Sequence, residues 1–286
     1  MKKILITGAL GNVGGYLAKW AINNQLSIRL VDINKKNLED RYGTEVDTVR
    51  FDFLDPTTFE PALEGVDRIF LMRPPHLGQP SDLEPFINAI ASSEDIVLVS
   101  FLSLIGIEKN PIPPHYRLEK MIEKKGIPYC HIRPSFYMQN ISGIHAFEIK
   151  HFDQIIIPAS NALISFIDAD DIGKFICHVF TEPHKHQNKA YSITGPEAIG
   201  YKTVANLMSE ELDRPISYDN PSPALAKKYW INIRGLDKQY ATVMGLLYMM
   251  TRLNTARKVT STYKEITSHE PTRIKEFIRK NRTAWL

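Results

Sequence analysis

The sequence is poor in cysteine, in long apolar runs and in charge of one sign, and each shortage excludes a class of protein. Its two cysteines, Cys130 and Cys177, lie in apolar surroundings, so a disulfide framework is excluded. No segment approaches the roughly 18 consecutive apolar residues of a membrane-spanning helix. The apolar run at the N-terminus is too short for a signal peptide. We therefore expect a cytoplasmic protein with buried, unreactive thiols.

The net charge of +3 is small for 286 residues and is spread along the chain. A nucleic-acid site would need clustered Lys and Arg, whereas the most basic stretch, at 273–282, alternates with apolar residues at helical spacing. His184 and His186 lie in a polar turn without an obvious third ligand, so we expect no metal site. The expected partner is a small-molecule substrate, with no nucleic acid and no membrane, and a homodimer is compatible with this composition.

Apolar β-type runs alternate with helical patterns over the first half of the chain. Strands are expected at 3–9, 27–33, 46–55, 67–75, 95–103 and 128–134, and helices at 12–24, 58–66, 83–93 and 117–126. This alternation is typical of βαβ units and a parallel sheet. A run as apolar as IVLV at 96–99 suits a strand that is buried on both faces. We predict an α/β protein with a doubly wound parallel sheet of the Rossmann type.

After Pro134 this rhythm changes, because residues 135–165 are rich in aromatic side chains and methionine. A helix at 168–183, a strand at 189–195 and a helix from 200 follow, and the chain is mostly helical from about 221. We predict a dinucleotide-binding domain of residues 1–134, completed by about 168–194. Residues 135–167 and 195–286 would form a smaller, mostly helical substrate domain.

Three glycines, Gly8, Gly11 and Gly14, form a G-x-x-G-x-x-G pattern between the first expected strand and the first expected helix. Glycines at this point permit a tight turn and a close approach of the backbone to a pyrophosphate. The helix N-terminus offers N–H groups and a positive dipole end to phosphate. We expect a dinucleotide here, held also by the other residues of the turn: Leu10, Asn12 and Val13.

Asp32 ends the second expected strand, about twenty residues beyond the glycines. A carboxylate there accepts hydrogen bonds from the adenosine ribose and repels a 2′-phosphate. Lys35 and Lys36 follow closely and could compensate for such a phosphate. The cofactor is therefore NAD or NADP, with NAD favoured by Asp32.

Other cofactor contacts are expected at the ends of the third and fourth strands. Asp52 and Phe53 could reach the adenine, or Asp52 could simply form the turn before the next helix. The backbone of Leu71, Arg73 and Pro74 lies beside the expected cofactor path.

Several segments together resemble the NmrA-like group of atypical short-chain dehydrogenases/reductases. They are ILITGALGNVG at 4–14, GIPYCHIRPSFYMQNI at 126–141, FIDADDIGKF at 166–175 and the long stretch at 191–218, so the resemblance covers nearly the whole chain. Leu10 replaces the usual Thr of this group, and Asp32 stands where it often has an Arg. The resemblance implies an NAD(P)H-dependent oxidoreductase that transfers hydride to a small quinone, dye or carbonyl substrate. The alternative that it implies is an NAD(P)-sensing regulator without turnover.

The same resemblance directs attention to the start of the expected helix at 117–126. The group often has a His there, which aligns with His115, and Tyr116 and Lys120 form a Y-x-x-x-K pattern with both side chains on one helix face. Ser103 lies near the spacing of the wider superfamily's catalytic serine. His115 could donate a proton with a pKa near neutrality, or Tyr116 could if Lys120 lowered its pKa. Protonation by solvent, without a protein acid, is the third option.

The pocket lining is expected from the segment after Pro134 and from the C-terminal helices. A mostly apolar pocket with few polar anchors suits a flat aromatic or quinone-like substrate. For each candidate the alternative is ordinary core packing, and the Met-rich run at 243–250 is expected to be core or lid. The candidates are Phe136, Tyr137, Met138, Asn140, Phe166 and Trp230.

Overall fold

The computed structural model describes residues 2–286 of the chain, which divide into two compact units. Unit 1 runs to Pro134 and also contains Ala169–Ile193 and Glu265–Ser268. Unit 2 consists of Ser135–Asp168, Thr194–Lys264 and His269–Leu286. None of the helices within residues 2–286 is both long enough and apolar enough to cross a membrane.

Unit 1 is built on a seven-stranded sheet in which every strand pair is parallel. Its strand order is β3-β2-β1-β4-β5-β6-β8, so the order reverses between β1 and β4. This arrangement confirms the predicted doubly wound Rossmann-type sheet, which binds its ligands at the carboxyl ends of the strands beside the reversal. The strands are β1 Lys3–Thr7, β2 Ile28–Asp32, β3 Thr48–Arg50, β4 Val66–Leu71, β5 Leu98–Leu102, β6 Tyr129–Pro134 and β8 Lys189–Ile193.

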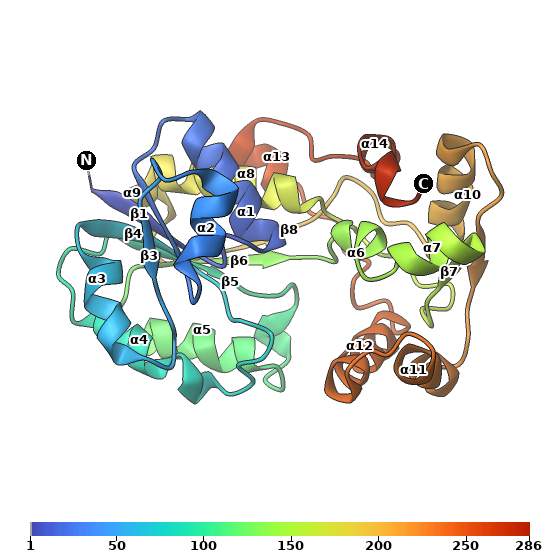
Figure 1. The fold of residues 1–286 in the computed structure, drawn as a ribbon, viewed down its shortest axis with the longest axis horizontal. Coiled ribbons are helices and arrows are strands. Elements are labelled where there is room, and N and C mark those ends of the chain that lie inside the picture. The colour runs from blue at the N-terminus through green and yellow to red at the C-terminus, as the bar shows by residue number, and fades with distance from the viewer. Residues whose placement is uncertain (1) are drawn as a thin grey trace. The chain divides into compact units, whose positions relative to one another are not determined.

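Helices cover both faces of this sheet (Figure 1). One face carries α1 (Asn12–Asn23) and α8 (Ala169–Thr181), and the other carries α3 (Phe59–Leu63), α4 (Glu84–Ala91) and α5 (Pro114–Lys124). A Cβ at Gly173 would lie 2.7 Å from the backbone nitrogen of Leu17, so this glycine lets α8 pack closely on α1. Short 3₁₀ turns occur at Pro56–Thr58, Pro80–Asp82 and Ile107–Lys109, and α9 spans Pro183–His186.

Two helices of unit 1 were not expected from the sequence. The short α9 stands where His184 and His186 were expected in a polar turn, and His186 is buried there. α2 (Lys35–Tyr42) follows β2, and Leu38 is its single buried residue. A helix that buries one side chain shows almost no apolar periodicity, which is the main sequence signal for a helix. Both cysteines are buried and unpaired as expected, and burial raises the pKa of the Cys177 thiol to about 11.

Unit 2 has its own apolar core, which contains Tyr201, Trp230, Phe277 and Trp285. Its two short strands, β7 (Gln154–Ile156) and β9 (Ser217–Asp219), pair in parallel. The helices are α6 Gln139–Ser142, α7 Ala146–Phe152, α10 Tyr201–Leu212, α11 Pro223–Asn232, α12 Lys238–Thr251 and α14 Ile274–Lys280. α13 (Thr262–Thr267) is divided between the two units, and a last 3₁₀ turn spans Arg282–Ala284.

Candidate cofactor site

The turn between β1 and α1 has the geometry that the three glycines predicted. Gly8 has a φ of +64°, in the left-handed region that favours glycine. The Gly11 N–H donates to the Gly8 carbonyl at 2.9 Å, and Gly11 is the residue that precedes the first turn of α1. A Cβ at Gly14 would lie 2.3 Å from the Gly8 carbonyl oxygen, so no side chain fits there.

The N-terminus of α1 is suited to an anion. No side chain within the described chain caps it, and its first turn contains no acidic residue. Gly11 and Asn12 are both exposed. The N–H groups of a first helical turn have no partners within the helix, and the helix dipole places partial positive charge beside them. This end of α1 can therefore hold a phosphate group at the reversal of strand order.

α2 supports the glycine turn from behind through contacts that the sequence did not reveal. The Tyr42 hydroxyl donates to the Ala9 carbonyl at 2.5 Å, and Arg41 Nη1 donates to the Leu10 carbonyl at 2.8 Å. Met72 packs against Gly8: a Cβ added to Gly8 would lie 2.8 Å from Met72 Cγ. These side chains come from distant parts of the sequence, and no local motif marks them.

Asp32 lies half-buried at the carboxyl end of β2, as expected. Its Oδ1 accepts a hydrogen bond from the Asn34 N–H at 3.0 Å, which fixes the carboxylate at the start of the loop. Lys35, which could have compensated for a 2′-phosphate, pairs with Glu39 at 3.1 Å. Lys36 is exposed.

The residues expected near the adenine have clear structural roles. Asp52 Oδ1 accepts from the Leu54 N–H at 2.9 Å, so this carboxylate forms the turn after β3. Phe53 is 7% exposed and packs against Phe51 and Phe86, with ring centroids 4.8 and 5.7 Å away. The turn explains the position of Asp52, and core packing explains the position of Phe53, so neither residue requires a bound ligand.

β1 and β4 lie where the strand order of the sheet reverses, and hydrogen bonds of Thr7 join them. Arg73 holds the loop that follows β4. The Thr7 hydroxyl donates to the Phe70 carbonyl at 2.9 Å and accepts from the Met72 N–H at 3.0 Å. Arg73 Nη1 donates to the carbonyls of Pro74 at 3.1 Å and Leu77 at 2.6 Å. Leu71 is fully buried, so this residue presents no surface to a ligand here.

His115 is the second residue of α5, which begins at Pro114. Burial, and then the nearby positive charge of Arg73, lower the pKa of His115 to about 4. The expectation of a pKa near neutrality is therefore wrong, because the charged imidazolium loses solvation next to a cation. The neutral ring remains able to donate or accept a hydrogen bond, and its Nδ1 has no partner among the described residues.

Tyr116 and Lys120 do share one face of α5, with Lys120 Nζ 6.0 Å from the centre of the Tyr116 ring. Lys120 is exposed, and its Nζ lies 2.6 Å from Glu123 Oε2. The hydrogen bond to Glu123 raises the pKa of Lys120. The ammonium group is thus directed to a carboxylate rather than to the phenol. Ser103 is buried, and its hydroxyl has no partner within residues 2–286.

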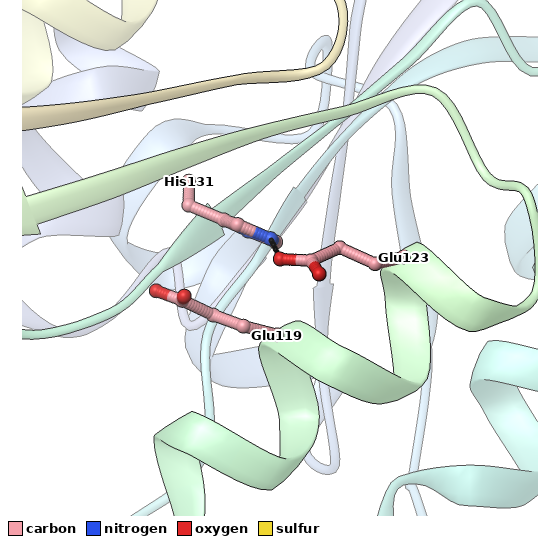
Figure 2. A group of neighbouring side chains, drawn as sticks. All are labelled: Glu119, Glu123 and His131. Carbon is pink, nitrogen blue, oxygen red and sulfur yellow. Dashed lines mark ion pairs between the residues drawn. The ribbon is translucent and has the colours of Figure 1, made fainter. Parts of the chain in front are cut away.

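The C-terminal half of α5 meets β6 at a group of polar side chains, Glu119, Glu123 and His131 (Figure 2). Glu119 receives two hydrogen bonds from Arg133, at 2.6 and 3.0 Å, and Glu123 Oε1 lies 3.4 Å from His131 Nε2. The ligand atoms of Glu119, Glu123 and His131 lie within 4.8 Å of one another, a spacing that could hold a metal ion. Arg133 pairs with Glu119 and Lys120 pairs with Glu123, so both carboxylates have cationic partners, and the Arg133 pair joins α5 to β6.

The six substrate candidates of unit 2 fall into two groups. Met138, Phe166 and Trp230 are at most 3% exposed and belong to the apolar core, which leaves almost none of their surface for a substrate. Phe136, Tyr137 and Asn140 are half-buried. The sequence also gave no sign of a buried polar group near them: His145 Nε2 lies 2.5 Å from the Tyr248 hydroxyl, and Arg234 pairs with Glu148.

A glycine turn that excludes side chains, an anion-binding helix end and a carboxylate at the end of β2 define a dinucleotide-binding Rossmann domain. The NmrA-like family profile matches residues 1–278, and the chain belongs to this family. It is 29% identical to prestalk A differentiation protein A of Dictyostelium discoideum, over 97% of this chain and 91% of that protein. It is 24% identical to the NAD(P)H azoreductase of Xenophilus azovorans, over 99% of both.

Solved structures share the fold over nearly the whole chain. The triphenylmethane reductase of Citrobacter sp., complexed with NADP(H), has a TM-score of 0.86 and 18% identity, over 98% of this chain and 100% of that one. NmrA, a negative transcriptional regulator in complex with NADP, has a TM-score of 0.79 and 15% identity, over 100% of this chain and 98% of that one.

Proposed function

We propose that the protein is an NAD(P)H-dependent oxidoreductase that transfers hydride to a small quinone, dye or carbonyl acceptor. The observation that carries the proposal is the glycine turn below the uncapped N-terminus of α1, where Gly14 leaves no room for a side chain. The similarity to an NAD(P)H azoreductase along the whole chain supports the same activity. The nicotinamide supplies the hydride when it is bound, and the protein positions the two reactants.

The proposed cofactor preference is for NADH. Asp32 would accept hydrogen bonds from the two ribose hydroxyls, and its charge would repel a 2′-phosphate. The pairing of Lys35 with Glu39 supports this preference, because that ammonium is already engaged.

The proposed role of His115 is to orient the acceptor through its neutral ring. A group with a pKa of about 4 is almost entirely unprotonated at neutral pH, so it holds no ionisable proton to give. We assign the proton that follows the hydride to solvent. The engagement of Lys120 with Glu123 argues against proton donation by Tyr116, because the ammonium is hydrogen-bonded to that carboxylate and lies 6.0 Å from the centre of the Tyr116 ring.

A second candidate function is an NAD(P)-sensing regulator without turnover. The specific observation in its favour is that neither His115 nor the Tyr116 and Lys120 pair is arranged as a proton donor. The fold likeness to NmrA is compatible with this function. A sensor requires cofactor binding and a partner protein, but no acceptor.

Two measurements on the purified protein separate these functions. Calorimetric titration with NADH, NADPH and their oxidised forms tests binding, and absorbance at the reduced nicotinamide band tests turnover with a panel of quinones and azo dyes. Binding together with turnover supports the reductase. Binding that differs between redox states, without turnover on any acceptor, supports the sensor. A protein that binds none of the four dinucleotides is neither.

A further inference from the structure

Three polar side chains at the carboxyl edge of β4 and β5 have buried atoms without a hydrogen-bond partner. Within residues 2–286 these atoms are the Nε of Arg73, the hydroxyl of Ser103 and the Nδ1 of His115. Leu71 of β4 and Phe101 of β5 are paired in the sheet, and Arg73 and Ser103 each follow one of them by two residues. The Phe101 ring lies 6.1 Å from the His115 ring, so the start of α5 meets the same edge. Buried polar groups are normally hydrogen-bonded, so three such groups at one edge point to a polar ligand.

Arg73 is a half-buried cation that forms no ion pair with any carboxylate of residues 2–286. Its Nη1 donates to the carbonyls of Pro74 and Leu77, which hold the guanidinium in place but bring no charge. Burial lowers the pKa of Arg73, and the charge of Asp82 raises it by less. Asp82 Oδ2 accepts a hydrogen bond from the Gln79 N–H at 2.9 Å, so this carboxylate is bound to its own turn. The positive charge of Arg73 is therefore only partly balanced, and a bound anion would stabilise it.

The start of α5 adds no negative charge beside Arg73. Its first turn contains no acidic residue, no side chain of the described residues caps it, and the helix dipole places partial positive charge there. Glu119, four residues after His115, accepts two hydrogen bonds from Arg133 of β6. His115 is neutral, because burial and the charge of Arg73 lower its pKa to about 4, so its ring can donate a hydrogen bond but brings no charge. This edge therefore suits a ligand group with negative charge and more than one acceptor oxygen, such as a carboxylate or a sulfonate.

The phosphates of the cofactor are expected at a different part of unit 1. They are assigned to the N-terminus of α1, which covers one face of the sheet, whereas α5 covers the other (Figure 1). The groups around Arg73 belong to the α5 side: the loop at 74–77 and the 3₁₀ turn Pro80–Asp82, which packs on α5. An anion bound by Arg73 and His115 is thus separate from the glycine turn. It fits the acceptor, which His115 is proposed to orient.

We propose that the acceptor carries a carboxylate or sulfonate group, and that Arg73, Ser103 and His115 bind this group. Arg73 supplies the positive charge and its Nε–H, the Ser103 hydroxyl donates one hydrogen bond, and His115 donates another as the Nδ1–H tautomer. The bound anionic group then fixes the position of the quinone or dye to which it is attached. This proposal rests on the proposed reductase function, because it names the chemical class of the acceptor.

The first test compares two azo dyes that differ by one negative charge, para-methyl red and its methyl ester, as acceptors of NADH. The wild type is expected to reduce the carboxylate with a kcat/KM about tenfold above that of the ester, because the ester lacks the charge contact. Arg73→Gln keeps a donor for the Leu77 carbonyl but loses the charge, so the preference should disappear through a higher KM for the carboxylate, and Arg73→Lys should restore part of it. The matched control is Arg117→Gln, which removes the same charge at an exposed position of α5 and should keep the preference. A wild type that reduces both dyes equally, or an equal loss of preference in Arg117→Gln, overturns the proposal.

The second test does not depend on turnover. The protein, with and without saturating NAD⁺, is titrated with dansyl acid and dansylamide, which differ by one negative charge and report binding by their fluorescence. Dansyl acid should bind about tenfold more tightly than dansylamide, Arg73→Gln should bind both equally, and Ser103→Ala should weaken the binding of dansyl acid about fivefold. Equal affinities in the wild type overturn the proposal. Displacement of dansyl acid by NAD⁺ also overturns it, because Arg73 would then bind the cofactor phosphates.

The two tests separate this proposal from the reductase function. Arg73-dependent binding of dansyl acid without reduction of any acceptor would remove the reductase function and keep the anion site. Reduction of both dyes at equal kcat/KM, with equal binding of the two dansyl compounds, would keep the reductase function and overturn the anion site. Circular dichroism spectra equal to that of the wild type check that the variants fold. If Arg73→Gln does not fold, Arg73→Lys and the two ligand pairs on the wild type still decide.

Discussion

Gly14 and Gly8 are in direct contact: a Cβ added to Gly14 would lie 2.3 Å from the Gly8 carbonyl oxygen and 2.7 Å from its carbonyl carbon. Distances under 3.0 Å are essentially never found for real Cβ atoms, so any side chain at this position must move the turn. The obstacle is backbone, which cannot rotate away as a flexible side chain can. Gly14 therefore sets the shape of the surface that a pyrophosphate would meet.

Gly14→Ala is expected to weaken dinucleotide binding, because the added Cβ must displace the backbone of the turn. A circular dichroism spectrum equal to that of the wild type checks that the variant folds. Calorimetric titration with NADH should show an affinity at least tenfold weaker than that of the wild type. Gly78→Ala is the matched control, since a Cβ there meets no atom within 4 Å. Equal affinities for the two variants would show that the glycine turn does not bind the cofactor.

Asp32→Ser should shift the cofactor preference towards NADPH. The substitution removes the negative charge that opposes the 2′-phosphate and keeps a small side chain that can accept the Asn34 N–H, the partner of Asp32 in this structure. One lost unfavourable charge contact corresponds to about 1–2 kcal/mol, or roughly a fivefold to thirtyfold gain in relative affinity for NADPH. The dissociation constants of NADH and NADPH for both proteins measure the shift. A wild type that already prefers NADPH would contradict the assigned role of Asp32.

The sequence predicted the sheet and its cofactor turn because both depend on local patterns. Apolar runs mark buried strands, and three glycines between a strand and a helix have one common structural meaning. The seven parallel strands and the positions of Gly8, Gly11 and Gly14 follow these patterns.

What the sequence could not predict depends on contacts between distant residues. The pKa of His115 is lowered by burial and by Arg73, which stands 42 positions earlier in the chain, and no spacing rule relates the two. Arg41 and Tyr42 hold the glycine turn from a helix whose pattern was too weak to predict. Trp230 was a candidate for the pocket lining with core packing as the alternative, because aromatic side chains occur in both places, and it is fully buried.

Tyr116→Phe and Lys120→Met are expected to change the turnover number less than threefold. In this structure Lys120 is bound to Glu123, and its ammonium lies 6.0 Å from the Tyr116 ring centre. Initial rates with the best quinone of the panel measure the effect. His115→Ala is compared in parallel and should raise KM more than it lowers kcat, since the ring would orient the acceptor without donating an ionisable proton. A loss of a hundredfold or more in Tyr116→Phe would instead make the phenol the acid.

Stability should fall as the pH decreases from 6.5 towards 4. Burial lowers the pKa of His131 to about 4, and burial followed by the charge of Arg234 lowers that of His145 to about 3. At a pH between these folded-state pKa values and the unfolded-state pKa of about 6.5, the two histidines bind protons in the unfolded chain but not in the folded protein. Each of the two histidines therefore lowers the free energy of unfolding by about 1 kcal/mol at pH 5.5 relative to pH 7.

Urea unfolding at pH 7.0 and 5.5 measures this loss, and His145→Gln should reduce it. The control is His151→Gln, which makes the same substitution at an exposed histidine of α7. A wild type with the same unfolding free energy at both pH values would show that these two rings are protonated in the folded protein.

Glu119→Gln is expected to destabilise unit 1 by about 3 kcal/mol, because it leaves the buried charge of Arg133 without its main partner. Glu119 is 1% exposed and Arg133 is 13% exposed, and two hydrogen bonds join them at 2.6 and 3.0 Å. Asp213→Asn is the matched control: it makes the same carboxylate-to-amide change in an arginine pair, but Asp213 is 80% exposed, so the cost should be at most about 1 kcal/mol. Urea unfolding at pH 7 compares the two variants with the wild type. Equal costs would mean that the Arg133 pair between α5 and β6 contributes no more than a surface pair, and that other contacts fix the helix that carries His115.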